Sequence, residues 1–195
     1  MTKRLVLHLL LACGAAVMAA AAVLGPSPAK AFKIVQSVYD SYDPFEMHYA
    51  GDDRDFWTVV LGNPFPAPKP VVDSALTAAM ATTRWGKRTN FTTTPDDSAR
   101  RVYRIVMLLN GNTLTGYRIC GYYPDRPLGP GAHDGKIHVV ATFCRGQQPL
   151  SQAVGSTDAA TPNDPEFRKF VRQLMANLLP THNPQRPRGD PIRIR

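Results

Sequence analysis

The sequence predicts an α+β fold, a two-layer sandwich in which a mixed sheet of four or five strands carries two helices packed on one face. Three observations lead to this class. Segments rich in β-branched and aromatic residues alternate with two segments of helical periodicity. The first strand, helix and strand suit a right-handed crossover between parallel strands. The later strands follow one another through turn signals, which favours antiparallel pairing.

The first half of the body contains one clear strand and one clear helix. Residues 56–61 are β-branched and aromatic, as in a strand. Residues 33–39 have a weaker pattern, and they are the possible fifth strand of the predicted sheet. Prolines at alternate positions over 64–70 predict a rigid connector, which leads into a helix over 72–85. Residues 87–101 are polar and rich in threonine, so we expect a loop there.

The second half begins with a strand that is apolar at almost every position, residues 102–109. Such a pattern predicts burial on both faces of the sheet. An Asn-Gly-Asn turn follows, and residues 117–122 are expected to return as an antiparallel strand. Residues 124–135 hold several prolines and glycines and predict a long loop. Residues 136–143 alternate in character and predict the next strand.

The last predicted element is an amphipathic helix. Asn163 is the predicted N-cap, with Glu166 three residues on, as in a capping box, and Pro165 in the first turn. Pro180 ends the segment. One apolar stripe recurs at helical spacing and should face the sheet. Its members are Phe167, Phe170, Val171, Leu174 and Leu178.

Residues 1–31 have the pattern of an export signal. A basic start precedes an apolar run over 5–24, then a Gly-Pro break and an Ala-Lys-Ala sequence that predicts cleavage after Ala31. Two alternatives stay open. The run is long enough for an uncleaved N-terminal anchor, and the Leu-Leu-Ala-Cys sequence ending at Cys13 is similar to a lipidation signal. All three place the remaining chain outside the cytoplasm, either periplasmic or secreted, or membrane-anchored and facing the periplasm.

The remaining chain divides into one domain and a tail. A chain of 195 residues that is 44% hydrophobic is typical of a single globular domain, which we place at residues 32–179. Residues 180–195 carry four arginines and one aspartate, and we expect a basic, flexible tail that folding does not require. Without residues 1–31 the net charge falls from +8 to +5, and the domain alone carries only +2. That distribution does not indicate a nucleic-acid-binding face.

Two cysteines remain after residue 31, Cys120 and Cys144. Both lie in strand-like segments, and an even number in an exported chain favours a disulfide between adjacent strands. Two buried free thiols are the alternative. The spacing matches neither a Cys-x-x-Cys redox motif nor a zinc site.

No catalytic, nucleotide-binding or metal-binding motif is found, and no cofactor is expected. His48 with the acidic residues at 52–55 reads as a solvated acidic turn, and Arg100-Arg101 as a solvated charge pair. The chain is therefore predicted to be a non-enzymatic module of the bacterial cell envelope. It would bind a protein partner, or itself, through a sheet edge or an uncovered sheet face.

Two other functions stay open. A small periplasmic enzyme with dispersed active-site residues is one of them. The other is a surface-associated protein whose basic tail meets anionic lipid or polymer. In each case contact with a membrane is expected only through the N-terminal segment or, weakly, through the tail.

Overall fold

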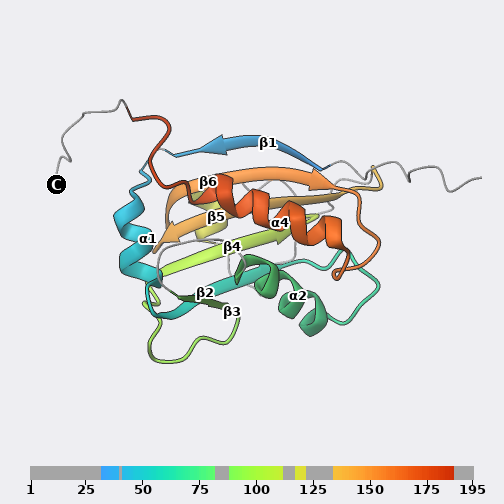
Figure 1. The fold of residues 1–195 in the computed structure, drawn as a ribbon, viewed down its shortest axis with the longest axis horizontal. Helices are drawn as coiled ribbons and strands as arrows, with labels where there is room; N and C mark the ends of the chain where they lie inside the picture. The colour runs from blue at the N-terminus through green and yellow to red at the C-terminus, as the bar shows by residue number, and fades with distance from the viewer. Residues whose placement is uncertain (1–31, 40, 82–87, 112–116, 122–133, 187–195) are drawn as a thin grey trace, which may run out of the picture.

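The computed structural model in Figure 1 is built around one six-stranded mixed sheet, with strand order β1-β6-β5-β4-β2-β3. The structure describes residues 32–39, 41–81, 88–111, 117–121 and 134–186. The strands are β1 (Lys33–Val38), β2 (Arg54–Leu61), β3 (Thr89–Thr92), β4 (Tyr103–Leu109), β5 (Ile137–Arg145) and β6 (Gln148–Thr157). The helices are α1 (Pro44–Gly51), α2 (Lys69–Ala81), α3 (Tyr117–Cys120) and α4 (Pro165–Leu178).

The predicted α+β class is confirmed, with six strands in place of the expected four or five. The parallel pairs are β2 with β3 and β2 with β4, as the crossover prediction requires, and all other pairs are antiparallel. Helices α2 and α4 lie side by side on one face of the sheet (Figure 1). The two-helix layer was therefore predicted correctly, and the additional helices α1 and α3 lie outside it.

Three local predictions are corrected, and two elements had not been predicted. Residues 117–120 form the short helix α3 and not a strand, and residues 89–92 form β3 within the expected loop. Helix α1 and strand β6 were not predicted at all. Helix α4 is capped by Asp164, whose side chain accepts from the Glu166 amide, and not by Asn163. Either residue type suits an N-cap, so the choice depends on backbone geometry.

The main core lies between the sheet and the α2–α4 layer. The α4 stripe is completely buried there, as its spacing predicts. Gly155 of β6 lets both β1 and the Phe170 ring of α4 pack directly against the backbone of β6. A Cβ at this position would stand 2.7 Å from Lys33 O and 2.8 Å from Phe170 Cε2. Side chains of alternate β4 residues fill this core, while Val106 and Leu108 point to the opposite face. The prediction of burial on both faces is confirmed for β4, residues 103–109, whereas Val102 precedes the strand and is 52% exposed.

The chain beyond α4 docks against the segment that leads into α1. Asn183, only 8% exposed, donates through Nδ2 to Tyr39 O at 2.9 Å and to Tyr42 O at 3.0 Å. Gln185 Oε1 accepts from Tyr39 N at 3.1 Å. These bonds satisfy backbone groups that would otherwise lack partners.

The Tyr42 hydroxyl adds a fourth bond by donating to Pro180 O at 2.7 Å. Burial raises the pKa of this hydroxyl far above its usual range, so it remains a donor at any physiological pH. The predicted boundary of the tail at residue 180 therefore lies too early, and residues 180–186 belong to the domain. Residues 187–195 lie outside the described residues.

This docking reverses the expectation that the whole tail is dispensable. Truncation after Pro180 should lower the melting temperature by roughly 5–10 °C, because the lost hydrogen bonds together contribute about 2–3 kcal/mol and each kcal/mol moves the transition by about 2–4 °C. Truncation after Arg186 is the matched control and should shift it by no more than about 1–2 °C. Calorimetry of both chains provides the comparison, and equal melting temperatures would contradict the docking of residues 180–186.

No helix in the described part of the chain is long and apolar enough to cross a membrane. The predictions for the N-terminal segment, namely cleavage after Ala31, an uncleaved anchor over residues 1–31, or lipidation at Cys13, fall outside the described residues. They remain predictions.

Candidate functional site

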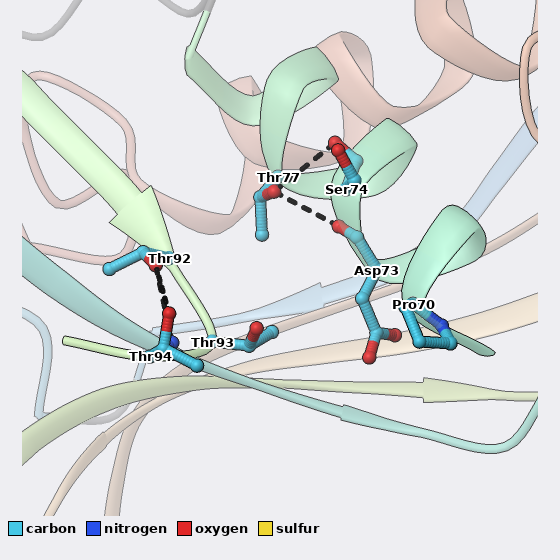
Figure 2. Close-up of a pocket in the computed structure, with 7 residues that line it drawn as sticks. All are labelled: Pro70, Asp73, Ser74, Thr77, Thr92, Thr93 and Thr94. Atoms are coloured by element: carbon cyan, nitrogen blue, oxygen red, sulfur yellow. Dashed lines mark hydrogen bonds between the residues drawn. The ribbon is translucent and has the colours of Figure 1, made fainter.

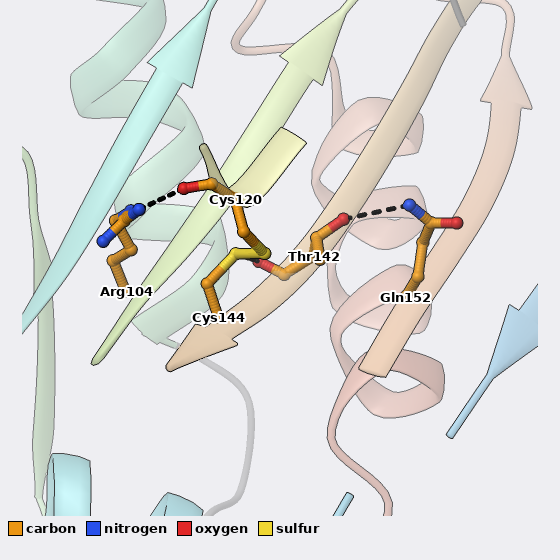
Figure 3. Close-up of a disulfide and its surroundings, with 5 residues drawn as sticks. All are labelled: Arg104, Cys120, Thr142, Cys144 and Gln152. Carbon is orange, nitrogen blue, oxygen red and sulfur yellow. Dashed lines mark hydrogen bonds between the residues drawn. A yellow bond between two sulfur atoms is a disulfide. The ribbon is translucent and has the colours of Figure 1, made fainter. Parts of the chain in front are cut away.

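A disulfide joins the two cysteines that the sequence paired. Cys120 and Cys144 are fully buried, and their Cα atoms are 5.6 Å apart (Figure 3). Cys144 lies on β5 as expected, whereas Cys120 lies on α3 and not on an adjacent strand. A disulfide is characteristic of an oxidising compartment. Because both residues are inaccessible, the bond is structural and is not suited to thiol exchange.

The disulfide fixes α3 against the second face of the sheet. Arg104 on β4 donates from Nη2 to Cys120 O, and its guanidinium lies 5.5 Å from the Trp57 ring. Beside the disulfide, Gln152 Nε2 donates to Thr142 Oγ1 at 3.2 Å (Figure 3). A small apolar cluster includes the disulfide. Its members are Leu61, Val106, Leu108, Ile119, Cys120, Val140 and Cys144. This face was expected to stand open for a partner, and its centre is instead buried.

A polar groove of about 400 Å³ lies between α2 and the segment after β3 (Figure 2). Its walls carry one carboxylate and several hydroxyl groups. The lining residues are Pro70, Asp73, Ser74, Thr77, Thr92, Thr93 and Thr94. Asp73 is paired with Lys69, and the Thr77 hydroxyl donates within its own helix to Asp73 O at 2.9 Å. The hydroxyls thus have no free carboxylate or histidine in the lining to activate them.

The histidines that the structure describes do not converge on a site. His48 Nδ1 lies 3.3 Å from Asp52 Oδ1, and His138 Nε2 lies 2.8 Å from Asp134 Oδ1 on a different part of the molecule. The hydrogen bond from His138 lowers the pKa of the Asp134 carboxyl. Within the described ranges no three His, Cys, Asp or Glu side chains are grouped to hold a metal ion.

The most unusual surface is the end of the sheet where α1 meets the start of β4. We call it the aromatic end and define it as Phe45, Tyr49, Arg100 and Val102. Phe45 is 70% exposed, Tyr49 58% and Val102 52%. Phe45 and Tyr49 are four residues apart on α1 and so share one helix face. Large apolar side chains that gather on a surface in this way mark a candidate site of contact.

At the aromatic end, the Tyr49 ring and the backbone of residues 100–102 are held in place by neighbours. Tyr49 meets the Tyr103 ring edge-on, with centroids 6.0 Å apart, and the Arg100 guanidinium carbon stands 3.1 Å above the Tyr49 ring. Tyr103 N donates to Arg100 O at 2.8 Å, which ties this loop to β4. The carbonyl of Val102 accepts from Gly146 N, in the β5–β6 turn, at 2.7 Å.

An ion pair beneath the rings anchors α1 to the β5–β6 hairpin. Glu46 Oε1 lies 2.6 Å from Arg145 Nη1, and Arg145 Nη2 donates to Gln148 Oε1 at 3.0 Å. Burial, reinforced by the charge of Glu46, raises the pKa of the Tyr103 hydroxyl. At the same N-terminal end of the helix, the Asp43 side chain accepts from Phe45 N at 2.9 Å and caps α1. The rings therefore project from a fixed base.

Sequence reasoning missed the aromatic end as a site. For Arg100 it favoured a solvated charge pair over contact with an acidic partner. It proposed no helix at residues 44–51, so the shared face of Phe45 and Tyr49 could not be seen. The available signal was Asp43-Pro44, an N-cap followed by proline, ahead of two aromatic residues at helical spacing.

No protein-family model matches the chain, and no curated protein matches it. Among solved structures, nine chains match. One is a PelC dodecamer from Paraburkholderia phytofirmans, which is 14% identical, with a TM-score of 0.39 and an alignment that covers 80% of this chain and 100% of that one. A TM-score this low does not establish a shared fold, and nothing about this chain is inferred from it.

Proposed function

We propose that this chain is an exported, non-enzymatic binding module that docks a protein partner through the aromatic end. The observation that carries the proposal is the exposure of Phe45 and Tyr49, one helical turn apart on a helix fixed by the Glu46–Arg145 ion pair. The few residues that dominate the binding energy at protein interfaces are enriched in tyrosine, tryptophan and arginine, and phenylalanine is enriched at interface cores. A rigid base lowers the entropy lost when such side chains are immobilised by a partner.

Two further features support an extracytoplasmic place of action, periplasmic or secreted. Disulfides such as Cys120–Cys144 form and persist in oxidising compartments and are rare in a bacterial cytosol. The first 31 residues have the charge and hydropathy pattern of an export signal. A partner reached through the aromatic end would therefore be another protein of the cell envelope or the medium.

Site-specific photocrosslinking in the cells that make the protein tests this proposal. A photoreactive phenylalanine analogue at Phe45 should give a discrete adduct of higher mass, because the partner would cover this ring. Val71 on α2, 44% exposed, is the matched control, since it is apolar and accessible but lies outside the aromatic end. The adduct from position 45 should disappear when Tyr49→Ser is added.

Two results would count against the proposal. In the first, the photoreactive analogue gives no adduct when it is placed at position 45 or at position 49. In the second, the analogue at position 71 gives the same adduct as the analogue at position 45. Fractionation of the same cells checks the compartment, and a wholly cytosolic protein would contradict export.

A further inference from the structure

The chemistry of the partner can be inferred from Arg100, on the basis of the proposed function. Its guanidinium stacks on the Tyr49 ring at 3.1 Å, and within the described part of the chain no carboxylate forms an ion pair with it. One of its nitrogens, Nη1, is buried and has no hydrogen-bond partner. Among the described residues Arg100 is thus a partly desolvated cation with no carboxylate paired to it, and it lies against Tyr49, one of the exposed rings of this surface.

The neighbouring arginines of the same surface are engaged elsewhere. Arg145 is committed to Glu46 and to Gln148. Arg101 donates from Nη2 to Pro95 O at 3.2 Å, and its charge is felt by Asp96, whose pKa is lowered chiefly by hydrogen bonds from Ser98 and also by Arg101. Glu46 is in turn paired with Arg145 through Oε1. Among the described arginines of this surface, Arg100 is therefore the one that has neither an ion pair nor a carboxylate that responds to its charge.

We infer that the partner presents a carboxylate directly beside an apolar side chain, so that Arg100 receives the carboxylate while Phe45 and Tyr49 receive the apolar group. An unpaired, partly desolvated guanidinium attracts an incoming carboxylate more strongly than a solvated one, because the surroundings screen the charges less. Arginine also binds carboxylates in a fixed, two-pronged geometry that a stacked position pre-organises. Because Nη1 is buried, the partner's carboxylate would bind the edge formed by Nε and Nη2. The same charge disfavours a basic segment.

Selection of phage-displayed random dodecapeptides on the purified protein tests this inference, because such a library samples acidic, basic and apolar sequences alike. Peptides that bind the wild type and not Phe45→Ser should be enriched in Asp and Glu next to apolar residues. Arg100→Gln should weaken individual selected peptides by about tenfold or more, as expected for a hydrogen bond between charged groups. Arg100→Lys keeps the charge without the two-pronged geometry and should fall in between.

Arg172→Gln on α4, an exposed arginine away from the aromatic end, is the matched control and should change nothing. A melting curve that matches that of the wild type shows that a variant is folded. Added salt should weaken the binding of the selected peptides to the wild type. Phe45-dependent peptides without acidic enrichment, or unaffected by Arg100→Gln, would overturn the inference and leave the proposed function standing. A selection that yields no Phe45-dependent peptide would count against both.

Discussion

Replacing Phe170 by alanine is expected to lower the free energy of unfolding by about 3–5 kcal/mol, a large part of the roughly 5–15 kcal/mol typical of a domain. The ring is fully buried between α4 and the sheet. It contacts Phe32 and Phe167, with centroids 6.0 and 6.4 Å away, and stands over Gly155. Removing it leaves a cavity at the point where α4, β1 and β6 meet. Denaturation by urea, monitored by circular dichroism, measures the loss.

Lys169→Ala provides the control for helix propensity at the adjacent position. Lys169 is 60% exposed, and its weak contacts are Glu166 Oε2 at 3.9 Å and the Phe32 ring at 5.7 Å. Exposed interactions of this kind contribute no more than about 1 kcal/mol. A loss at Phe170 no larger than the loss at Lys169 would show that α4 is not part of the folding core in solution, and that its apolar stripe serves a partner instead.

The elements that could be predicted from the sequence are those whose pattern and burial agree. The α4 stripe repeats at i, i+3, i+4, i+7 and i+11, and every member of it is buried. Strand β4 is buried on both faces, as its apolar sequence predicts, because α2 and α4 cover one side and the α3 cluster covers the other. In both elements local preference and tertiary packing favour the same structure.

Prediction failed where packing overrides composition. Strand β6 contains Pro149, Gly155 and several polar residues, yet it pairs with β5 on one side and β1 on the other, and its small residues allow α4 to approach. Residues 117–120 are strand-like in composition, but the disulfide holds them as a helical turn on the sheet. Strand propensity describes fit to a pleated surface rather than a backbone requirement, so it cannot distinguish these cases.

The candidate site could not be predicted from the sequence for a related reason. Exposure of Phe45 and the stacking of Arg100 on Tyr49 depend on residues about fifty positions apart, brought together when α1 packs beside the start of β4. A single sequence shows where the aromatic residues are but not which of them are exposed, and aromatic residues usually fill a core. Only the three-dimensional structure distinguishes Tyr42, fully buried, from Tyr49, more than half exposed, seven residues later.

Replacing both cysteines by alanine, Cys120→Ala with Cys144→Ala, is expected to lower the free energy of unfolding by about 3.5 kcal/mol. The estimate follows from the entropy of closing a loop with a sequence separation of 24 in the unfolded chain. Reduced wild-type protein is the matched control for the altered side chains. If the covalent link is what stabilises the fold, reduction and the double substitution should have similar effects.

The loss should also be unevenly distributed, which gives the test a local readout. Helix α3 has four residues, too few to persist by backbone hydrogen bonding alone. Its attachment to the sheet depends on the disulfide to β5 and on the bond from Arg104, on β4, to Cys120 O. Hydrogen exchange at residues 118–121 should therefore accelerate far more than exchange in β4 or α4. If wild-type protein that is purified without reductant and then denatured shows two titratable thiols, the disulfide itself is contradicted. Unchanged exchange at α3 in the double variant would show that packing of Ile119, rather than the covalent bond, holds this segment on the sheet.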